Sequence, residues 1–234
     1  MLFRSFNDAL DASEDRLHPK KSSRPVANGS VSASTAMMLA SGLLILGVLI
    51  AVQLSMQFTL LGLGYLGVQV AYSSGLKQVQ LADVTCIALG FVIRAVAGGA
   101  ATGLPVTSWF IIVVSATSFF VASAKRSSEI AQLGEESKTR DVLLKYGHEY
   151  LRLLWTSSMT VAIVAYVIWS SEIPQGQNLA RLTAAPFALT MLRYASHAVA
   201  GDAEEPERVI LKDKALLGLS AVWAALFVLR AALL

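Results

Sequence analysis

The side chains best suited to metal chemistry lie near the start of the chain, in the pattern Asn7-Asp8-x-x-Asp11-x-x-x-Asp15. On a helix, positions 7, 11 and 15 share one face and Asp8 lies beside them. Three carboxylates and an amide that converge there would repel one another without a cation between them. Such oxygen ligands suit Mg²⁺, which usually bridges to substrate phosphates. We predict that all four residues bind Mg²⁺ and that Asp11 and Asp15 are catalytic; a solvated acidic helix end is the alternative.

A basic stretch follows this acidic pattern. It contains Arg16, Lys20, Lys21 and Arg24 within nine positions. A metal ion held by carboxylates can bridge to a pyrophosphate, and lysines and arginines can then neutralise the remaining phosphate oxygens. The pattern therefore predicts that Lys21 and Arg24 bind substrate phosphate. A basic loop beside a membrane, with no ligand, is the alternative.

Membrane helices are the elements that must position these residues. Hydrophobic residues make up 55% of the 234 and charged residues 15%, whereas a soluble domain is about 45–50% apolar and about 25% charged. Seven apolar runs, without the alternation of barrel strands, each approach the ~20 residues that a bilayer crossing needs. They span residues 35–54, 57–76, 81–101, 106–123, 153–171, 181–199 and 215–234. We predict one all-α, polytopic integral-membrane domain over residues 1–234.

Charge is unevenly divided between the two ends of these spans. Threading the chain through a bilayer places four polar segments on one side, residues 7–34, 77–80, 124–152 and 200–214. Of the 16 acidic residues, only Glu172 falls on the other side, where Arg181 also lies and Arg230 lies nearby. Because basic loops stay in the cytoplasm, we expect a multi-pass plasma-membrane protein with a cytoplasmic active face. The net charge of +3 then indicates topology, and we expect no nucleic-acid partner.

The acidic pattern, followed by Arg24-Pro25-x-x-x-Gly29, resembles the first signature of the UbiA superfamily of intramembrane prenyltransferases. The resemblance implies a bundle of nine transmembrane helices around a central cavity. Two of those helices would precede Asn7, so the seven spans would be the third to the ninth. On this resemblance we expect the sequence to be shortened at its N-terminus.

The loop predicted at residues 124–152 lacks the second Asp-rich motif of that superfamily and has Asp141 as its only aspartate. It carries Lys125-Arg126-x-x-Glu129, then Arg140-x-x-x-x-Lys145-Tyr146. A Lys-Arg pair can bind a phosphate directly.

This combination resembles the UbiA branch that transfers a 5-phosphoribosyl group from phosphoribosyl pyrophosphate to decaprenyl phosphate, for cell-wall arabinan. Tyr72-x-x-x-Leu76-Lys77 and Glu204-Glu205-Pro206-Glu207 fit the same branch. The resemblance and the chemistry together give the expected substrate-binding residues: Lys21, Arg24, Tyr72, Lys77, Arg94, Lys125, Arg126, Glu129, Arg140 and Tyr146.

Arg94 lies inside the 81–101 span, where a charge is costly and usually functional. It could hold a phosphate in the cavity, or it could form a structural pair with Asp83 or with a backbone carbonyl. For Tyr72 and Lys77, simple placement at a helix end is the alternative to phosphate binding.

Three alternatives to the phosphoribosyltransferase remain open. A UbiA-type prenyltransferase acting on an aromatic or other small acceptor would need a second carboxylate cluster, which residues 124–152 do not provide. A transporter would need broken helices near the midplane and charge on both faces. An inactive assembly subunit is favoured only by the short N-terminus. Homo-oligomers are compatible with all of these.

Overall fold

In the computed structural model, residues 24–133, 146–173 and 176–233 can be described, and regular structure within them is entirely helical. The helices, in chain order, are α3 (Ala33–Leu54), α4 (Met56–Ser74), the 3₁₀ turn η1 (Leu76–Gln78), α5 (Ala82–Thr102), α6 (Ser108–Leu133), α8 (His148–Glu172), α9 (Gln177–Leu182), α10 (Ala184–Ala200), α11 (Pro206–Lys212) and α12 (Lys214–Ala232). Helices α3, α5, α6, α8 and α12 are long and apolar enough to cross a membrane. Helices α4 and α10 occupy the other two predicted spans. The prediction of an all-α, multi-pass membrane bundle is confirmed.

Two helix boundaries differ from the prediction in the segment expected to be a loop. Helix α6 continues ten residues past position 123, to Leu133, and α8 begins at His148, five residues before position 153. Residues 124–133 contain neither Gly nor Pro. Their charged side chains pair at helical spacing, Lys125 and Arg126 with Glu129, which favours helix over loop. The ends of the predicted loop 124–152 are therefore helical.

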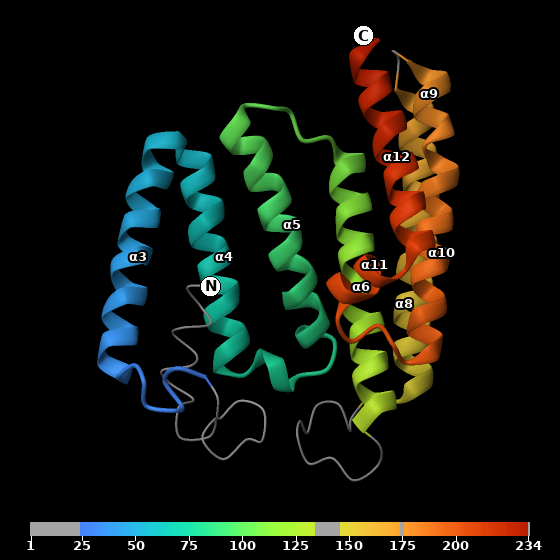
Figure 1. The fold of residues 1–234 in the computed structure, drawn as a ribbon. Coiled ribbons are helices and arrows are strands. Elements are labelled where there is room, and N and C mark those ends of the chain that lie inside the picture. The colour runs from blue at the N-terminus through green and yellow to red at the C-terminus, as the bar shows by residue number, and fades with distance from the viewer. Residues whose placement is uncertain (1–23, 134–145, 174–175, 234) are drawn as a thin grey trace.

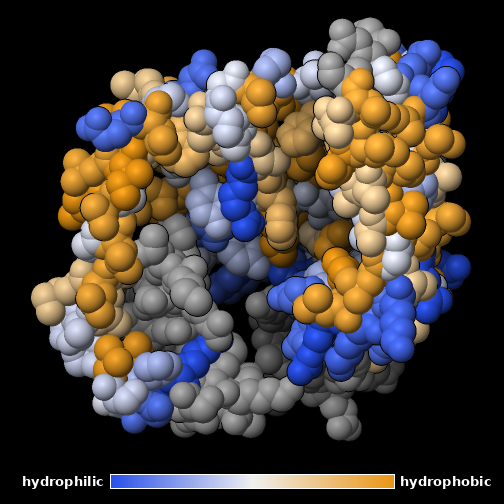
Figure 2. All heavy atoms as spheres, turned by 45° about the horizontal axis from the view of Figure 1, so that its top comes forward, coloured by the Kyte–Doolittle hydropathy of each residue, from blue (hydrophilic) through white to orange (hydrophobic). Residues whose placement is uncertain are grey.

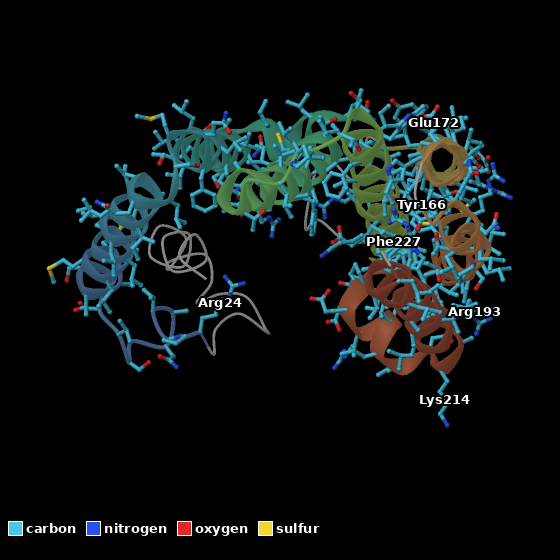
Figure 3. All side chains as sticks on the ribbon, turned by 90° about the horizontal axis from the view of Figure 1, so that it is seen from above. Arg24, Tyr166, Glu172, Arg193, Lys214 and Phe227 are labelled. Carbon is cyan, nitrogen blue, oxygen red and sulfur yellow. The ribbon has the colours of Figure 1, made fainter. Side chains whose placement is uncertain are left out.

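The helices follow one another along an arc. Figure 1 shows α3, α4, α5 and α6 side by side, followed by the group of α8, α10 and α12. Seen from above, α3 and α12 lie at the two ends of an arc that is open on one side (Figure 3). In Figure 2, hydrophobic side chains cover much of the outer wall, and hydrophilic side chains gather in the hollow and at one end. This arrangement suits an outer wall in lipid and an inner surface that binds polar groups.

The larger of two clusters of buried hydrophobic side chains includes residues of α6, α8 and α10. Phe120 is fully buried, and the centre of its ring lies 5.6 Å from that of Tyr194, in an edge-to-face arrangement, and 6.3 Å from that of Trp155. Tight caps shape the turns at the ends: the Ser55 hydroxyl accepts a hydrogen bond from the Phe58 N–H at 3.0 Å. The ring contacts of Phe120 fix which face of α6 turns towards α8 and α10.

Asp213 joins the start of α12 to α10. One carboxylate oxygen accepts hydrogen bonds from the N–H groups of Ala215 and Leu216, and so caps α12. The other oxygen lies 2.7 Å from both His197 Nε2 and Arg193 Nε. The His197 ring and then the Arg193 guanidinium hold the pKa of the Asp213 carboxyl well below its usual range.

We expect Asp213→Asn to lower the melting temperature in detergent, and Asp213→Ala to lower it further. Asn keeps the cap but loses the charge, whereas Ala loses both. Because the carboxylate is stabilised in the folded state, the deficit of Asp213→Asn should be full at neutral pH and shrink below about pH 4. Thermal unfolding across pH measures this. Lys214→Gln, at an exposed position on the outer side of the arc (Figure 3), is the control; an equal loss in that variant would contradict the assignment.

Candidate active site

A buried ion pair lies where α4, α5 and α6 meet at one end of the bundle. Asp83, in the first turn of α5, is completely buried. Arg126 of α6 donates from Nε and Nη2 to the two Asp83 oxygens, at 2.6 and 3.0 Å. The Tyr72 hydroxyl of α4 donates to Asp83 at 3.0 Å and accepts from Arg126 Nη2 at 3.1 Å. Three helices are thus joined by one cluster, Tyr72, Asp83 and Arg126.

Glu129 and Lys125 extend this cluster towards solvent. Arg126 Nη1 donates to Glu129 at 2.5 Å, one turn further along α6. The Lys125 ammonium lies 4.0 Å from the other Glu129 oxygen, and its side chain is 38% exposed, against 3% for Arg126. The two neighbouring cations therefore differ: Arg126 faces inward to carboxylates, and Lys125 faces a surface that a phosphate can reach.

Tyr146 is buried beside the same cluster. Its hydroxyl accepts a hydrogen bond from the Leu81 N–H at 2.5 Å. Leu81 has a φ of 64°, in the left-handed region that residues other than glycine rarely adopt. Burial raises the pKa of Tyr146, so its hydroxyl stays protonated at neutral pH. Tyr146 therefore holds the start of α5 in place, one residue before the helix that carries Asp83.

Two more of the predicted phosphate-binding residues, Lys77 and Arg24, lie near the end of the bundle that holds the Asp83–Arg126 pair. Lys77 is partly exposed in the 3₁₀ turn between α4 and α5. Arg24 is partly exposed and lies between the two ends of the arc (Figure 3). The turn that links α10 to α11 reaches the same end, because the Ala203 N–H donates to Ser128 of α6 at 3.0 Å. Segments 77–80, 124–133 and 200–206 thus gather at one end, as threading the spans predicted.

Arg94 lies deeper in the bundle than the buried pair. It is eleven residues after Asp83 on α5, about 16 Å at helical rise. Its Nε donates to the Gly90 carbonyl at 2.8 Å, and its guanidinium lies 4.5 Å from the centre of the Phe91 ring and 5.4 Å from that of Tyr65. Of the two structural pairings considered for Arg94, the carbonyl is present, whereas Asp83 pairs with Arg126. The side chain is exposed, so its Nη groups can reach a ligand.

The predicted Mg²⁺ ligands lie outside the described residues. These are Asn7, Asp8, Asp11 and Asp15, and the same holds for the predicted phosphate ligands Lys21 and Arg140. Within the described ranges, no three His, Cys, Asp or Glu side chains are grouped so that they could hold a metal ion. The amide and carboxylate oxygens of the acidic pattern suit Mg²⁺ chemically.

Sequence reasoning missed the central role of Asp83. An aspartate at the start of an apolar span was a usable signal, because a carboxylate there needs a partner. Its partner could not be found from spacing, since Arg126 is 43 residues away.

The chain belongs to the UbiA prenyltransferase family, whose sequence profile matches residues 1–212. Within this family, it is 37% identical over 229 residues to the decaprenyl-phosphate phosphoribosyltransferase of Mycolicibacterium smegmatis, covering 93% of this chain and 72% of that protein. The proteins of the same name from Corynebacterium glutamicum and Mycobacterium tuberculosis are each 34% identical. These two matches cover 93% and 94% of this chain, and 68% and 73% of the relatives. The resemblance to the UbiA superfamily is confirmed.

We expect Arg126→Gln to destabilise the protein by about 3–5 kcal/mol, because it leaves the buried Asp83 charge without its partner. Asp83→Asn should destabilise it less, because Arg126 keeps its ion pair with Glu129. The double variant should lose less than the sum of the two. Thermal unfolding of all three variants in detergent measures the coupling. Lys125→Gln is the matched control beside Arg126, and should leave the melting temperature nearly unchanged. Additive losses from Arg126→Gln and Asp83→Asn would show that the pair does not hold the helices together.

Proposed function

We propose that this protein transfers the 5-phosphoribosyl group of phosphoribosyl pyrophosphate to decaprenyl phosphate. The products are decaprenylphosphoryl 5-phosphoribose and pyrophosphate. The observation that carries this proposal is the 34–37% identity, over more than nine tenths of the chain, to enzymes named for this activity. The cluster of Tyr72, Asp83, Arg126 and Glu129, beside the exposed Lys125, supports it.

The reaction breaks the bond from the ribose C1 to the pyrophosphate oxygen and forms one from C1 to an oxygen of the lipid phosphate. Asn7, Asp8, Asp11 and Asp15 would hold Mg²⁺, which when bound neutralises the pyrophosphate as it leaves. The lipid phosphate is already anionic near neutral pH, so the nucleophile needs no strong general base. A reaction that needs charge neutralisation and no general base agrees with a site rich in cations.

The cations of the site divide into two kinds in this proposal. Lys125, Lys77 and Arg24 are partly exposed and contact the substrate phosphates, together with Lys21 and Arg140. Arg94 offers a further cation deeper in the hollow. Four residues position the others and do not contact the substrate in the described geometry: Arg126, Tyr72, Glu129 and Tyr146. Arg126 keeps α5 and α6 in register, Glu129 orients the Lys125 ammonium, and Tyr146 holds the start of α5.

The membrane location follows from the acceptor. A polyprenyl phosphate keeps its chain in the bilayer and its charged head at the surface, so an enzyme that acts on it must present its site there. We propose that the bundle spans the plasma membrane with its polar end in the cytoplasm, because most of the lysines and arginines that the structure describes lie at that end. The product would then serve as a precursor of cell-wall arabinan.

Membranes containing the protein, supplied with Mg²⁺, labelled phosphoribosyl pyrophosphate and decaprenyl phosphate, should move label into the organic phase. Omitting the lipid or chelating the metal should abolish the transfer, because each removes a reactant or the charge that stabilises the leaving group. Membranes without the protein are the control. Prenylation of an aromatic acid in place of phosphoribosyl transfer would instead favour the UbiA-type prenyltransferase.

Asp11→Asn should reduce turnover by at least about 100-fold, the scale of losing one electrostatic contact to the reacting group. The protein should still enter the membrane and unfold at the wild-type temperature. Lys125→Gln should raise KM for a phosphate substrate with a smaller loss of turnover. Turnover of Asp11→Asn equal to that of the wild type would remove the metal site from the proposal.

A further inference from the structure

A cavity of about 400 Å³ lies between α6, α8, α10 and α12, towards the end of the bundle away from Arg126. Six aromatic rings line it, those of Phe110, Tyr166, Trp169, Phe187, Trp223 and Phe227. Tyr166 stacks on Phe187 with ring centres 4.1 Å apart, and Trp169 stacks on Phe227 at 6.0 Å. Figure 3 shows Tyr166 and Phe227 on the inner sides of this helix group. A cavity of this size is typical of a small-molecule site.

The Tyr166 hydroxyl and Trp223 Nε1, two polar atoms of these rings, are hydrogen-bonded within the protein. The Tyr166 hydroxyl shares a hydrogen bond with Thr183 at 2.9 Å and accepts one from Trp223 Nε1 at 2.6 Å. The rings therefore turn carbon surfaces towards the cavity, and Val113 and Val114 of α6 add aliphatic ones. Ser118 and Thr117 also line the cavity, and the buried Thr117 Oγ1 has no hydrogen-bond partner among the described residues. The rest of the lining is carbon and favours a predominantly apolar ligand.

The cavity and the proposed phosphate site lie along one face of α6. Val114 and Ser118 line the cavity and are one turn apart. Lys125 follows Ser118 by seven residues, close to two full turns, so its side chain leaves the same face. From Val114 to Lys125 the rise is about 16 Å. A chain attached to a phosphate at Lys125 can run along this face and enter the cavity.

We propose that this cavity binds a segment of the polyisoprenoid chain of the acceptor lipid. The inference rests on the proposed function, because it takes a polyprenyl phosphate as acceptor. Isoprene units are flat at each double bond and carry a methyl branch, a shape that packs against ring faces and edges. The aromatic cavity would then select acceptors with long isoprenoid chains, while the cations at the other end bind the phosphate.

A photolabelled acceptor tests the occupant directly and needs no phosphoribosyl transfer. Tetraprenyl phosphate carrying a diazirine on its last isoprene unit, irradiated with the protein in membranes, should label the segments that line the cavity, residues 110–118, 166–169, 187 and 223–227. Excess decaprenyl phosphate should abolish the labelling, and excess phosphatidylglycerol should not. Equal competition by phosphatidylglycerol, or labelling confined to other segments, would overturn the proposal. Because this readout is binding, it is separable from failure of the transferase assay.

A pair of variants on α6 tests the cavity by filling it. Val114→Phe places a ring inside the cavity, whereas Ile112→Phe places the same ring at an exposed position on the opposite face of α6. We expect Val114→Phe to lose the photolabel and to raise KM for decaprenyl phosphate about tenfold, because the added ring takes the space that the chain would fill. Ile112→Phe should retain both wild-type values. Unchanged labelling and KM in Val114→Phe, with the protein folded, would exclude the cavity as the chain site.

Discussion

The position of the site depends on one interaction, the buried pair of Asp83 and Arg126. The neighbouring apolar helices could slide past one another with little change in hydrophobic contact, since lipid is as apolar as their side chains. A carboxylate with no exposed surface cannot tolerate such a shift, because losing its partner leaves an uncompensated charge in a medium of low dielectric. The two-pronged contact with Arg126 therefore fixes the register of α5 against α6, and the Tyr72 hydroxyl adds α4.

The same pair decides which cation can meet a substrate. Arg126 donates hydrogen bonds from Nε to Asp83, from Nη1 to Glu129 and from Nη2 to Tyr72. Two carboxylates inside the protein therefore balance its charge. Lys125, the preceding residue on the helix, projects about 100° away and its side chain is 38% exposed. The Lys-Arg pair is thus divided into a buried residue that joins the helices and a more exposed residue, which in the proposed function contacts a substrate phosphate.

The sequence predicts the helices well and the contacts between them poorly. The seven apolar runs correspond to the seven long helices among the described residues, and five of these helices are long and apolar enough to cross a membrane. The prediction ended α6 at residue 123 because hydropathy falls there, although Lys125, Arg126 and Glu129 continue the helix by pairing along its surface. The depth of Arg94 was predictable from its position in a span. The partner of Asp83 was not, since it depends on how α5 and α6 dock.

Helix α6 is where the two chemical requirements of a lipid-phosphate enzyme meet. Its cytoplasmic end, in the proposed topology, carries the charged cluster, and its other end borders an aromatic cavity with carbon surfaces. A charged cluster alone would bind any phosphate, and an aromatic cavity alone would bind any apolar chain. Val114 of the cavity and Lys125 lie on one face of this helix, about 16 Å apart, so in the two proposals a single rigid helix would couple recognition of the phosphate to recognition of the chain. Because the Asp83–Arg126 pair fixes the position of α6 against α5, it would also set the distance that the chain spans from the phosphate to the cavity.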